Sequence, residues 1–292
     1  MADSLTQKLE SVLARLDALL PPAVETDWSA PAFRWRTRHY LGARVGSLEA
    51  VHRIARIEPD DLRHIDAQKE AILRNTQQFV KGLPANNVLL TGARGTGKSS
   101  LIRACLMRFS ADGLRLIEVD KHDLVDLPDI VERIGGRSER FIVFCDDLSF
   151  DEGEGSYKAL KAALDGSIAA PSDNLLIYAT SNRRHLMPEY MRENLDTKYQ
   201  EDGEIHPGET VEEKISLSER FGLWLSFYPF RQDDYLDIVA HWLAQFGADT
   251  GLVEAARMEA LQFALLRGSR SGRVAQQFAR DFAGRHGLAP RE

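Results

Sequence analysis

The sequence predicts an α/β protein in which a parallel sheet is sandwiched by helices, with a C-terminal helical lid and an N-terminal helical extension. Between residues 88 and 180, short apolar runs alternate with segments of helical periodicity, which is the pattern of a parallel sheet. From residue 232 onward the pattern is helical throughout, which predicts a separate lid. Near the N-terminus, apolar residues recur at helical spacing over residues 4–20 until Pro21 and Pro22 end the helix.

The composition is that of a globular chain. The 292 residues are 43% hydrophobic and 28% charged, and the net charge is −7. This charge argues against a surface coated with nucleic-acid-binding groups, although a local basic face is compatible with it. No apolar stretch approaches the length of a membrane span, and the charges near the N-terminus are atypical of a signal peptide, so we expect a cytoplasmic protein. Cys105 and Cys145 stand in apolar runs and are expected to be buried free thiols.

The first 54 residues are expected to form the N-terminal helical extension and a linker. The amphipathic helix over residues 4–20 either packs on the following domain or docks on a partner or a neighbouring subunit. Residues 21–32 contain three prolines and are predicted to be the linker. Residues 33–56 interleave six arginines with aromatic residues. That pattern suits single-stranded nucleic acid or an acidic partner, and it equally suits a solvated face whose aromatic side chains turn inward.

Residues 92–99, GARGTGKS, match all eight positions of the phosphate-loop pattern, between the apolar run 88–90 and a helical run over 100–109. Its glycines let backbone N–H groups face phosphate oxygens, and the helix start adds the positive end of its dipole. Lys98 can reach the β- and γ-phosphates, and the Ser99 hydroxyl can bind Mg²⁺. An ordinary glycine-rich turn is the alternative, which the complete match disfavours. The predicted nucleotide-binding residues are Gly92, Ala93, Arg94, Gly95, Thr96, Gly97, Lys98, Ser99 and Ser100.

Two acids follow the apolar run 141–145, which predicts a buried strand with carboxylates at its carboxyl end. In open parallel sheets, ligands bind at that edge. Asp146 is placed to hold Mg²⁺, directly or through water, and Asp147 is a candidate to polarise an attacking water. The next strand, 174–180, delivers Thr180, Ser181 and Asn182 to the same edge, where they can hydrogen-bond the γ-phosphate or the water. A capping role for Asn182 is the alternative.

The other expected elements complete a core and a lid. We expect a helix over residues 58–81, a strand over 114–119, helices over 124–134 and 156–168, and a long charged loop over 183–215. Arg220 stands just before an apolar strand, 223–230, and lid helices are expected over 233–246, over 252–266 and from Gly272 onward. The domains would be residues 1–54 for the extension, 55–230 for the α/β core and 231–292 for the lid.

Together these motifs resemble those of the AAA+ ATPases. Their order is that of the family: GARGTGKS as Walker A, FIVFCDD as Walker B, then ATSN, SERFG and a helical lid with a late arginine. The resemblance spans roughly residues 55–284. The phrases GLPANNVLLTGARGTGKSS, SNRRHLMPE and LSERFGLWLSFYPF are similar to an uncharacterised bacterial group of predicted AAA+ ATP-binding proteins. The SERFG segment also resembles replication initiators and helicase loaders.

The resemblance implies a role for each residue of the phosphate site. Lys98 would serve the phosphates, and Ser99 and Asp146 would serve Mg²⁺. Asn182 would be the first sensor, and residues 61–65 would lie near adenine.

It also implies two arginine roles. Arg220 would be the arginine finger, offered to the nucleotide of a neighbouring subunit, and Arg273 would be the second sensor, with Arg270 as a less suitable substitute. A cation beside the γ-phosphate stabilises transition-state charge. The predicted catalytic set is Lys98, Asp147, Asn182, Arg220 and Arg273.

Two departures from the family pattern matter. The family usually has glutamate at the position of Asp147, and one methylene less displaces the carboxylate enough to slow hydrolysis. In addition, residues 120–136 lack the aromatic–apolar–glycine motif of threading unfoldases, so a protein-threading motor is not expected.

The expected function is Mg²⁺-dependent binding and hydrolysis of ATP, coupled to conformational change of an assembly or partner. ATP and Mg²⁺ are the expected cofactors. The expected partners are further copies of the chain, joined head to tail, and an unknown protein client; no membrane is expected and nucleic acid is left open. The main alternative is a nucleotide-dependent switch or loader with little turnover. A small-molecule kinase and a nucleic-acid remodeller acting through residues 33–56 are the others.

Overall fold

Within the described residues the sheet has seven strands, and all neighbouring pairs but one are parallel. The computed structural model describes residues 25–40, 42–150, 155–165, 173–182 and 217–289, with five helical residues between 6 and 12. The strand order is β2-β1-β4-β5-β6-β3-β7, and only β1 and β2 are antiparallel. The strands are β1 (Ala32–Tyr40), β2 (Ala43–Val51), β3 (Val88–Gly92), β4 (Leu114–Glu118), β5 (Arg140–Cys145), β6 (Leu175–Ser181) and β7 (Leu223–Phe227). The predicted parallel sheet is therefore confirmed.

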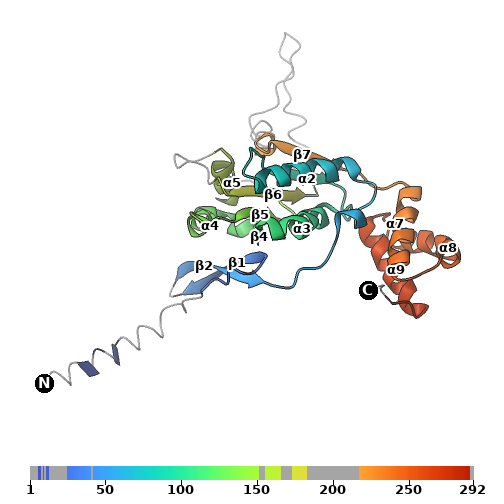
Figure 1. Cartoon of the computed structure of the whole chain (residues 1–292), viewed down its shortest axis with the longest axis horizontal. Coiled ribbons are helices and arrows are strands. Elements are labelled where there is room, and N and C mark those ends of the chain that lie inside the picture. The colour runs from blue at the N-terminus through green and yellow to red at the C-terminus, as the bar shows by residue number, and fades with distance from the viewer. Residues whose placement is uncertain are drawn as a thin grey trace, which may run out of the picture.

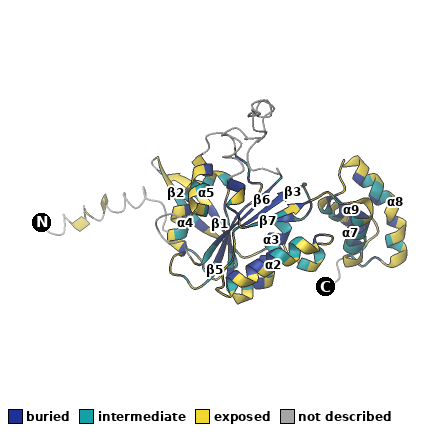
Figure 2. Cartoon of the chain, turned by 90° about the horizontal axis from the view of Figure 1, so that it is seen from above, coloured by how far each residue is buried: buried dark blue, intermediate teal, exposed yellow. Residues whose placement is uncertain are grey.

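Helices cover both faces of the sheet (Figure 1). On one face α2 (Asp66–Val80) and α3 (Lys98–Phe109) pack, and on the other lie the 3₁₀ segment η3 (Lys121–Asp126), α4 (Leu127–Ile134) and α5 (Gly155–Asp165). Two shorter 3₁₀ segments are η1 (Pro59–Asp61) and η2 (Ser110–Asp112). In Figure 2 the strands are mostly dark blue, between helices whose outer sides are exposed.

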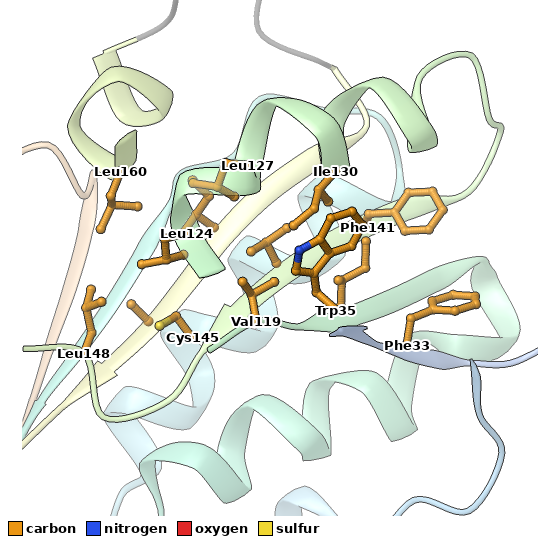
Figure 3. Close-up of a cluster of buried hydrophobic side chains, with 14 of the residues drawn as sticks. Phe33, Trp35, Val119, Leu124, Leu127, Ile130, Phe141, Cys145, Leu148 and Leu160 are labelled. Atoms are coloured by element: carbon orange, nitrogen blue, oxygen red, sulfur yellow. The ribbon is translucent and has the colours of Figure 1, made fainter. Parts of the chain in front are cut away.

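Both faces of the central strands are apolar because both are covered. Along β5, Phe141, Val143 and Cys145 enter one buried cluster, while Ile142 and Phe144 enter the cluster on the opposite face. Figure 3 shows Phe141 and Cys145 with the side chains of the first cluster. The apolar run before the two acids is thus a fully buried strand, as the sequence predicts.

Both cysteines are buried free thiols, as expected. Burial is the main cause that raises the pKa of Cys105 and of Cys145 to about 12. Neither side chain therefore provides a reactive thiolate.

Residues 32–51 correct the expectation that residues 1–54 form a helical extension and linker. They form the β1–β2 hairpin, and β1 pairs in parallel with β4, so the hairpin widens the sheet (Figure 1). The signal is the alternation of buried Phe33 and Trp35 with Arg34 and Arg36, which is the period of a half-buried strand. The indole of Trp35 covers Gly46, where a Cβ atom would lie 1.9 Å from the ring.

The hairpin arginines are largely engaged within the chain. Arg34 pairs with Glu118 over 2.9 Å, Arg36 pairs with Glu49 over 3.2 Å, and Arg44 pairs with Asp123 over 2.7 Å. Phe33 and Trp35 are buried and are not available to stack on bases. Of the two interpretations of residues 33–56, the structure favours the solvated face with its aromatics turned inward.

Three helices form the lid at one end of the molecule (Figure 1). They are α7 (Gln232–Gln245), α8 (Thr250–Leu266) and α9 (Gly272–Arg285), and they share an apolar cluster of their own. Each begins within two residues of its predicted start.

Three elements are shorter than expected, among them the helix predicted over 124–134, whose α-helical part begins at Leu127 after the 3₁₀ segment η3. The predicted helix over 58–81 begins only at Asp66, because His64 adopts a left-handed backbone with φ of 60°. The predicted strand 223–230 ends at Phe227. The expected loop 183–215 lies outside the described residues, as does most of the expected helix 4–20. No helix within the described part of the chain is long and apolar enough to cross a membrane.

Candidate functional site

The loop between β3 and α3 is fixed to strand β7 by close backbone packing. Gly92 has φ of 121°, and a Cβ atom there would lie 2.0 Å from the carbonyl oxygen of Phe227. The next amide, Ala93 N–H, donates to that same oxygen over 3.1 Å. Only glycine fits at the first position of the motif. The chain then curls toward Lys98, the first residue of α3.

Lys98 is buried, and its ammonium group lies at the start of the loop. Nζ donates to the carbonyl oxygens of Gly92 and Ala93 over 2.8 Å each and to Oδ1 of Asn182 over 3.1 Å. The structure therefore brings the lysine of the motif to the asparagine that follows β6.

The charges around Lys98 include further cations. Burial lowers the pKa of Lys98, and the positive charges of Arg273 and Arg94 lower it further, while the carboxylates of Asp146 and Asp147 act in the opposite direction. Three cations gather around one small volume, an arrangement that suits a polyanionic ligand.

The Ser99 hydroxyl and the Asp146 carboxylate meet directly. Ser99 Oγ donates to Asp146 Oδ1 over 2.6 Å, and Thr180 Oγ1 donates to the same oxygen over 2.5 Å. Hydroxyl and carboxylate oxygens are the ligands that Mg²⁺ prefers in proteins. The donor set fits a magnesium ion held by one carboxylate, one hydroxyl and water. Thr180 orients the carboxylate, a role that the sequence did not assign to it.

Asp147 adopts an unusual backbone conformation, with φ of 53°. Its N–H donates to Thr180 Oγ1 over 3.0 Å and to Asp146 Oδ1 over 3.2 Å, and Asn182 Nδ2 donates to its carboxylate over 2.6 Å. Among residues other than glycine, aspartate and asparagine adopt this left-handed region most readily. The backbone therefore offers a reason for aspartate at this position.

These groups line a cleft of about 560 Å³ that the sheet edge shares with the lid. The lining also includes apolar and aromatic side chains suited to a flat ring: Ile57, Leu62, Ile65, Phe230, Ile238 and Trp242. Asp61 and Arg63 line the cleft as well, so four residues of the segment 61–65 belong to its wall.

The first turn of α9 contacts the phosphate loop. Arg273 N–H donates to the carbonyl oxygen of Gly95 over 3.3 Å, and a Cβ atom on Gly95 would lie 2.7 Å from Ser271 Oγ. Arg273 lines the cleft, whereas Arg270 is not among its described lining residues. Of the two lid arginines, Arg273 is the one in position to meet a bound ligand.

A second set of contacts joins the lid to residues 61–64. His241 Nε2 of α7 lies 3.0 Å from Asp61 Oδ1, and Asp237 Oδ2 lies 2.9 Å from His64 Nε2 and 3.0 Å from Arg63 NH1. We call these side chains the lid latch: Asp61, Arg63, His64, Asp237 and His241. Asp234 adds a contact, its Oδ1 lying 3.4 Å from His64 Nδ1.

The lid latch predicts a small, pH-dependent contribution to stability. Burial acts to raise the pKa of Asp237, but hydrogen bonds from Arg63 and His64 outweigh it, so this pKa is below its ordinary value of 3.8. We expect Asp237→Asn to lower the free energy of unfolding by about 0.5 kcal/mol at pH 7, as is usual for half-exposed ion pairs. Since the folded pKa is depressed, the difference should persist down to about pH 5 and vanish as Asp237 is protonated below pH 4. Urea unfolding of both proteins over this range measures it; a difference that does not shrink below pH 4 would contradict it.

Arg220 lies apart from this cleft. Its guanidinium pairs with Asp165 of α5, and it is not among the described residues that line the cleft. The structure brings together Lys98, Asp147, Asn182 and Arg273 of the predicted catalytic set, and it leaves Arg220 elsewhere in the same chain.

Several residues that line the cleft or join the lid to the core stand in no sequence motif. His241, which contacts Asp61 from 180 residues away, and Trp242, which lines the cleft, stand in an ordinary amphipathic helix. Arg103 and Gln276 also line the cleft and likewise carry no motif. Only the spatial proximity of lid and core identifies them.

Comparison with known families gives one match over most of the chain. The profile of a family described as "Protein of unknown function (DUF815)" matches residues 29–286. No curated protein matches the sequence significantly.

Solved structures share the fold at low sequence identity. A RuvB variant from Thermotoga maritima is 14% identical with a TM-score of 0.51, covering 82% of this chain and 70% of that chain. ORC1 from Aeropyrum pernix, solved in complex with DNA, is 17% identical with a TM-score of 0.51, covering 80% of this chain and 65% of that chain. The chain spans 61% of the length of another RuvB variant. At these identities the likeness concerns the fold.

Proposed function

The chain belongs to the DUF815 family and has the AAA+ fold of RuvB and ORC1, and from this premise we propose that it binds and hydrolyses ATP with Mg²⁺. One observation carries the proposal: the phosphate-loop residues Lys98 and Ser99 meet Asp146 and Asn182 in a cleft whose lining also includes apolar and aromatic side chains. A nucleoside triphosphate has both matching parts, a polyanion for the charged groups and a flat ring for the apolar side chains.

The phosphates would lie against the loop and the first turn of α3. Backbone N–H groups of the loop and the Lys98 ammonium would bind the β- and γ-phosphates, in place of the carbonyl oxygens and the amide that Lys98 now contacts. Ser99 and Asp146 would hold Mg²⁺, which neutralises charge on the phosphate oxygens. Thr180 would keep the Asp146 carboxylate oriented.

Hydrolysis would depend on Asp147 and Asn182. The Asp147 carboxylate would accept a proton from the attacking water, and Asn182 would orient that water or the γ-phosphate. Their present hydrogen bond of 2.6 Å supports a shared site for both side chains. Arg273, carried by the lid, would add positive charge where the transition state gains negative charge.

Conformational change would follow from the position of the cleft. Because the lid helices α7 and α9 line it together with the sheet edge, a bound nucleotide would contact both bodies and draw them together. A partner that distinguishes the closed arrangement from the relaxed one would then sense the nucleotide state.

Arg220 supports assembly of several copies. We propose that it contacts the nucleotide of a neighbouring subunit, since its side chain stands outside the cleft of its own chain. An interface of this kind is head to tail, so it closes into a ring or continues as a filament.

A nucleotide-dependent switch with little turnover is the second candidate. Asp147 supports it, because its carboxylate is one methylene shorter than glutamate and accepts a hydrogen bond from Asn182. Such a protein would bind ATP and change conformation, and slow hydrolysis would set the lifetime of the ATP-bound conformation.

The decisive test of nucleotide binding is Lys98→Ala. Removing the ammonium group deletes charge-assisted hydrogen bonds to two phosphates, and we expect ATP affinity to fall about 100-fold. Calorimetric titration with ATP and Mg²⁺ measures the effect, and an unchanged melting curve shows that the fold is retained. Lys81→Ala, an exposed lysine at the end of α2, is the matched control and should bind like the parent. Binding and turnover that survive Lys98→Ala would overturn the proposal.

A further inference from the structure

The phosphate loop carries a second cation, Arg94, whose side chain has no partner among the described residues. It forms no hydrogen bond or ion pair there, whereas Lys98 makes three hydrogen bonds. Arg94 nevertheless lines the cleft. An exposed, unpaired guanidinium next to a phosphate-binding motif is available to a ligand.

The position of Arg94 identifies the end of the ligand that it would meet. Arg94 directly follows Gly92 and Ala93, whose carbonyl oxygens accept hydrogen bonds from Lys98 Nζ over 2.8 Å. The same ammonium lies 3.1 Å from Asn182, which in turn contacts Asp147. Arg94 therefore lines the cleft beside the loop carbonyl oxygens that hold Lys98, and Lys98 in turn contacts the asparagine that bonds Asp147.

The lid contact reinforces this placement. The residue after Arg94 is Gly95, against which Ser271 and Arg273 of α9 pack. Arg94 thus stands between the carbonyl oxygens that hold Lys98 and the first turn of α9. The charges of Arg94 and Arg273 both lower the pKa of Lys98, in agreement with three cations close to one another.

We propose that the Arg94 guanidinium binds the γ-phosphate of ATP within its own subunit, as a catalytic residue additional to Arg220 and Arg273. The inference rests on the proposed function and adds to it a residue that contacts the γ-phosphate and so distinguishes ATP from ADP. Guanidinium groups suit this task because their planar fork matches two phosphate oxygens.

Arg94 differs from the other two arginines in the body that carries it. Arg273 moves with the lid, and Arg220 would come from a neighbouring chain, but Arg94 is anchored to strand β3 through Gly92. Its charge is therefore present at the phosphate loop whether the lid is open or closed, and at any protein concentration. A single subunit would distinguish ATP from ADP before the lid closes.

The test compares the affinities of ADP and of a non-hydrolysable ATP analogue, both with Mg²⁺, by calorimetric titration. Arg94→Ala should weaken binding of the analogue about tenfold while ADP affinity stays within about twofold, because one charge-assisted contact to the γ-phosphate is lost. Arg94→Lys should recover part of the loss, since it restores the charge but not the fork. The Arg94→Ala substitution should also lower the ATP turnover rate by the same factor at every protein concentration.

Arg103→Ala is the matched control. Arg103 also lines the cleft and has no partner among the described residues, but it lies five residues beyond Lys98, in the second turn of α3. Its loss should weaken the binding of ADP and of the analogue equally, because Arg103 would contribute only to the overall positive potential of the cleft. The inference is wrong if Arg103→Ala lowers the affinity for the analogue relative to ADP as strongly as Arg94→Ala does. It is also wrong if Arg94→Ala lowers the affinities for both ligands alike. If the parent protein binds neither nucleotide, the proposed function itself fails.

Discussion

Arg220→Ala is expected to lower ATP turnover about 1000-fold, the usual effect of removing an arginine finger. ATP affinity should change little, because Arg220 is not among the described residues that line the cleft of its own chain. The charge would be missing only in the transition state, at the nucleotide of the neighbouring subunit. Turnover per subunit should rise with the concentration of the parent protein and stay low at all concentrations of the variant.

Two comparisons sharpen this experiment. Asp165→Ala removes the carboxylate that pairs with Arg220 and should keep most of the turnover, because Arg220 itself remains. Mixing Arg220→Ala with Lys98→Ala subunits should restore part of the activity, since each supplies what the other lacks at a shared interface. A parent that binds ATP but scarcely hydrolyses it at any concentration would favour the switch. Turnover that is independent of concentration and of Arg220 would contradict the role in a neighbouring subunit.

Asp147→Asn should also lower turnover about 1000-fold, within the range expected for loss of a general base. Asparagine keeps the shape of the side chain and tolerates the left-handed backbone at this position, so the variant should fold and bind ATP normally. Single-turnover hydrolysis and a separate titration with ATP distinguish the chemical step from binding. Hydrolysis at the parent rate would show that Asp147 does not act on the water.

Asp147→Glu tests the reason for the shorter acid. With φ of 53°, this position favours a short polar side chain that bonds locally, and glutamate would strain the turn between Asp146 and Leu148. We therefore expect glutamate to lower the melting temperature without raising turnover. A gain in turnover would mean instead that the length of the side chain limits the rate.

The sequence predicts the core of the fold and much of the site because both depend on local patterns. The strand before Asp146 is a continuous apolar run, since helices cover both faces of the sheet. Lys98, Ser99, Asp146 and Asn182 are found because parallel strands end at one edge, which brings residues far apart in the chain together.

The hairpin was missed for a physical reason. Arginines on one face of β1 and aromatics on the other obey the period of a strand, but the same residue types also suit a nucleic-acid-binding segment. Only the pairing of β1 with β4 and the ion pairs of the arginines distinguish the two explanations.

The lid contacts were not predictable from sequence. Asp61 and His241 are 180 residues apart, and neither stands in a pattern that names its partner. The left-handed backbone conformation of Asp147 was not predictable either, because it depends on hydrogen bonds from its N–H to Thr180 and Asp146.

The lid latch also limits how the lid can turn. The chain enters the lid once, between Phe227 of β7 and Gln232 of α7, and the lid latch attaches α7 a second time at residues 61–64. When the contact between α9 and Gly95 opens, the lid stays held at these two points and retains one easy degree of freedom, rotation about the line that joins them. Twisting and sliding of the lid would break the contacts of the lid latch. We therefore expect the lid to rotate about this single axis. Nucleotide binding at the phosphate loop would then move α8, the lid helix that does not line the cleft, in one direction.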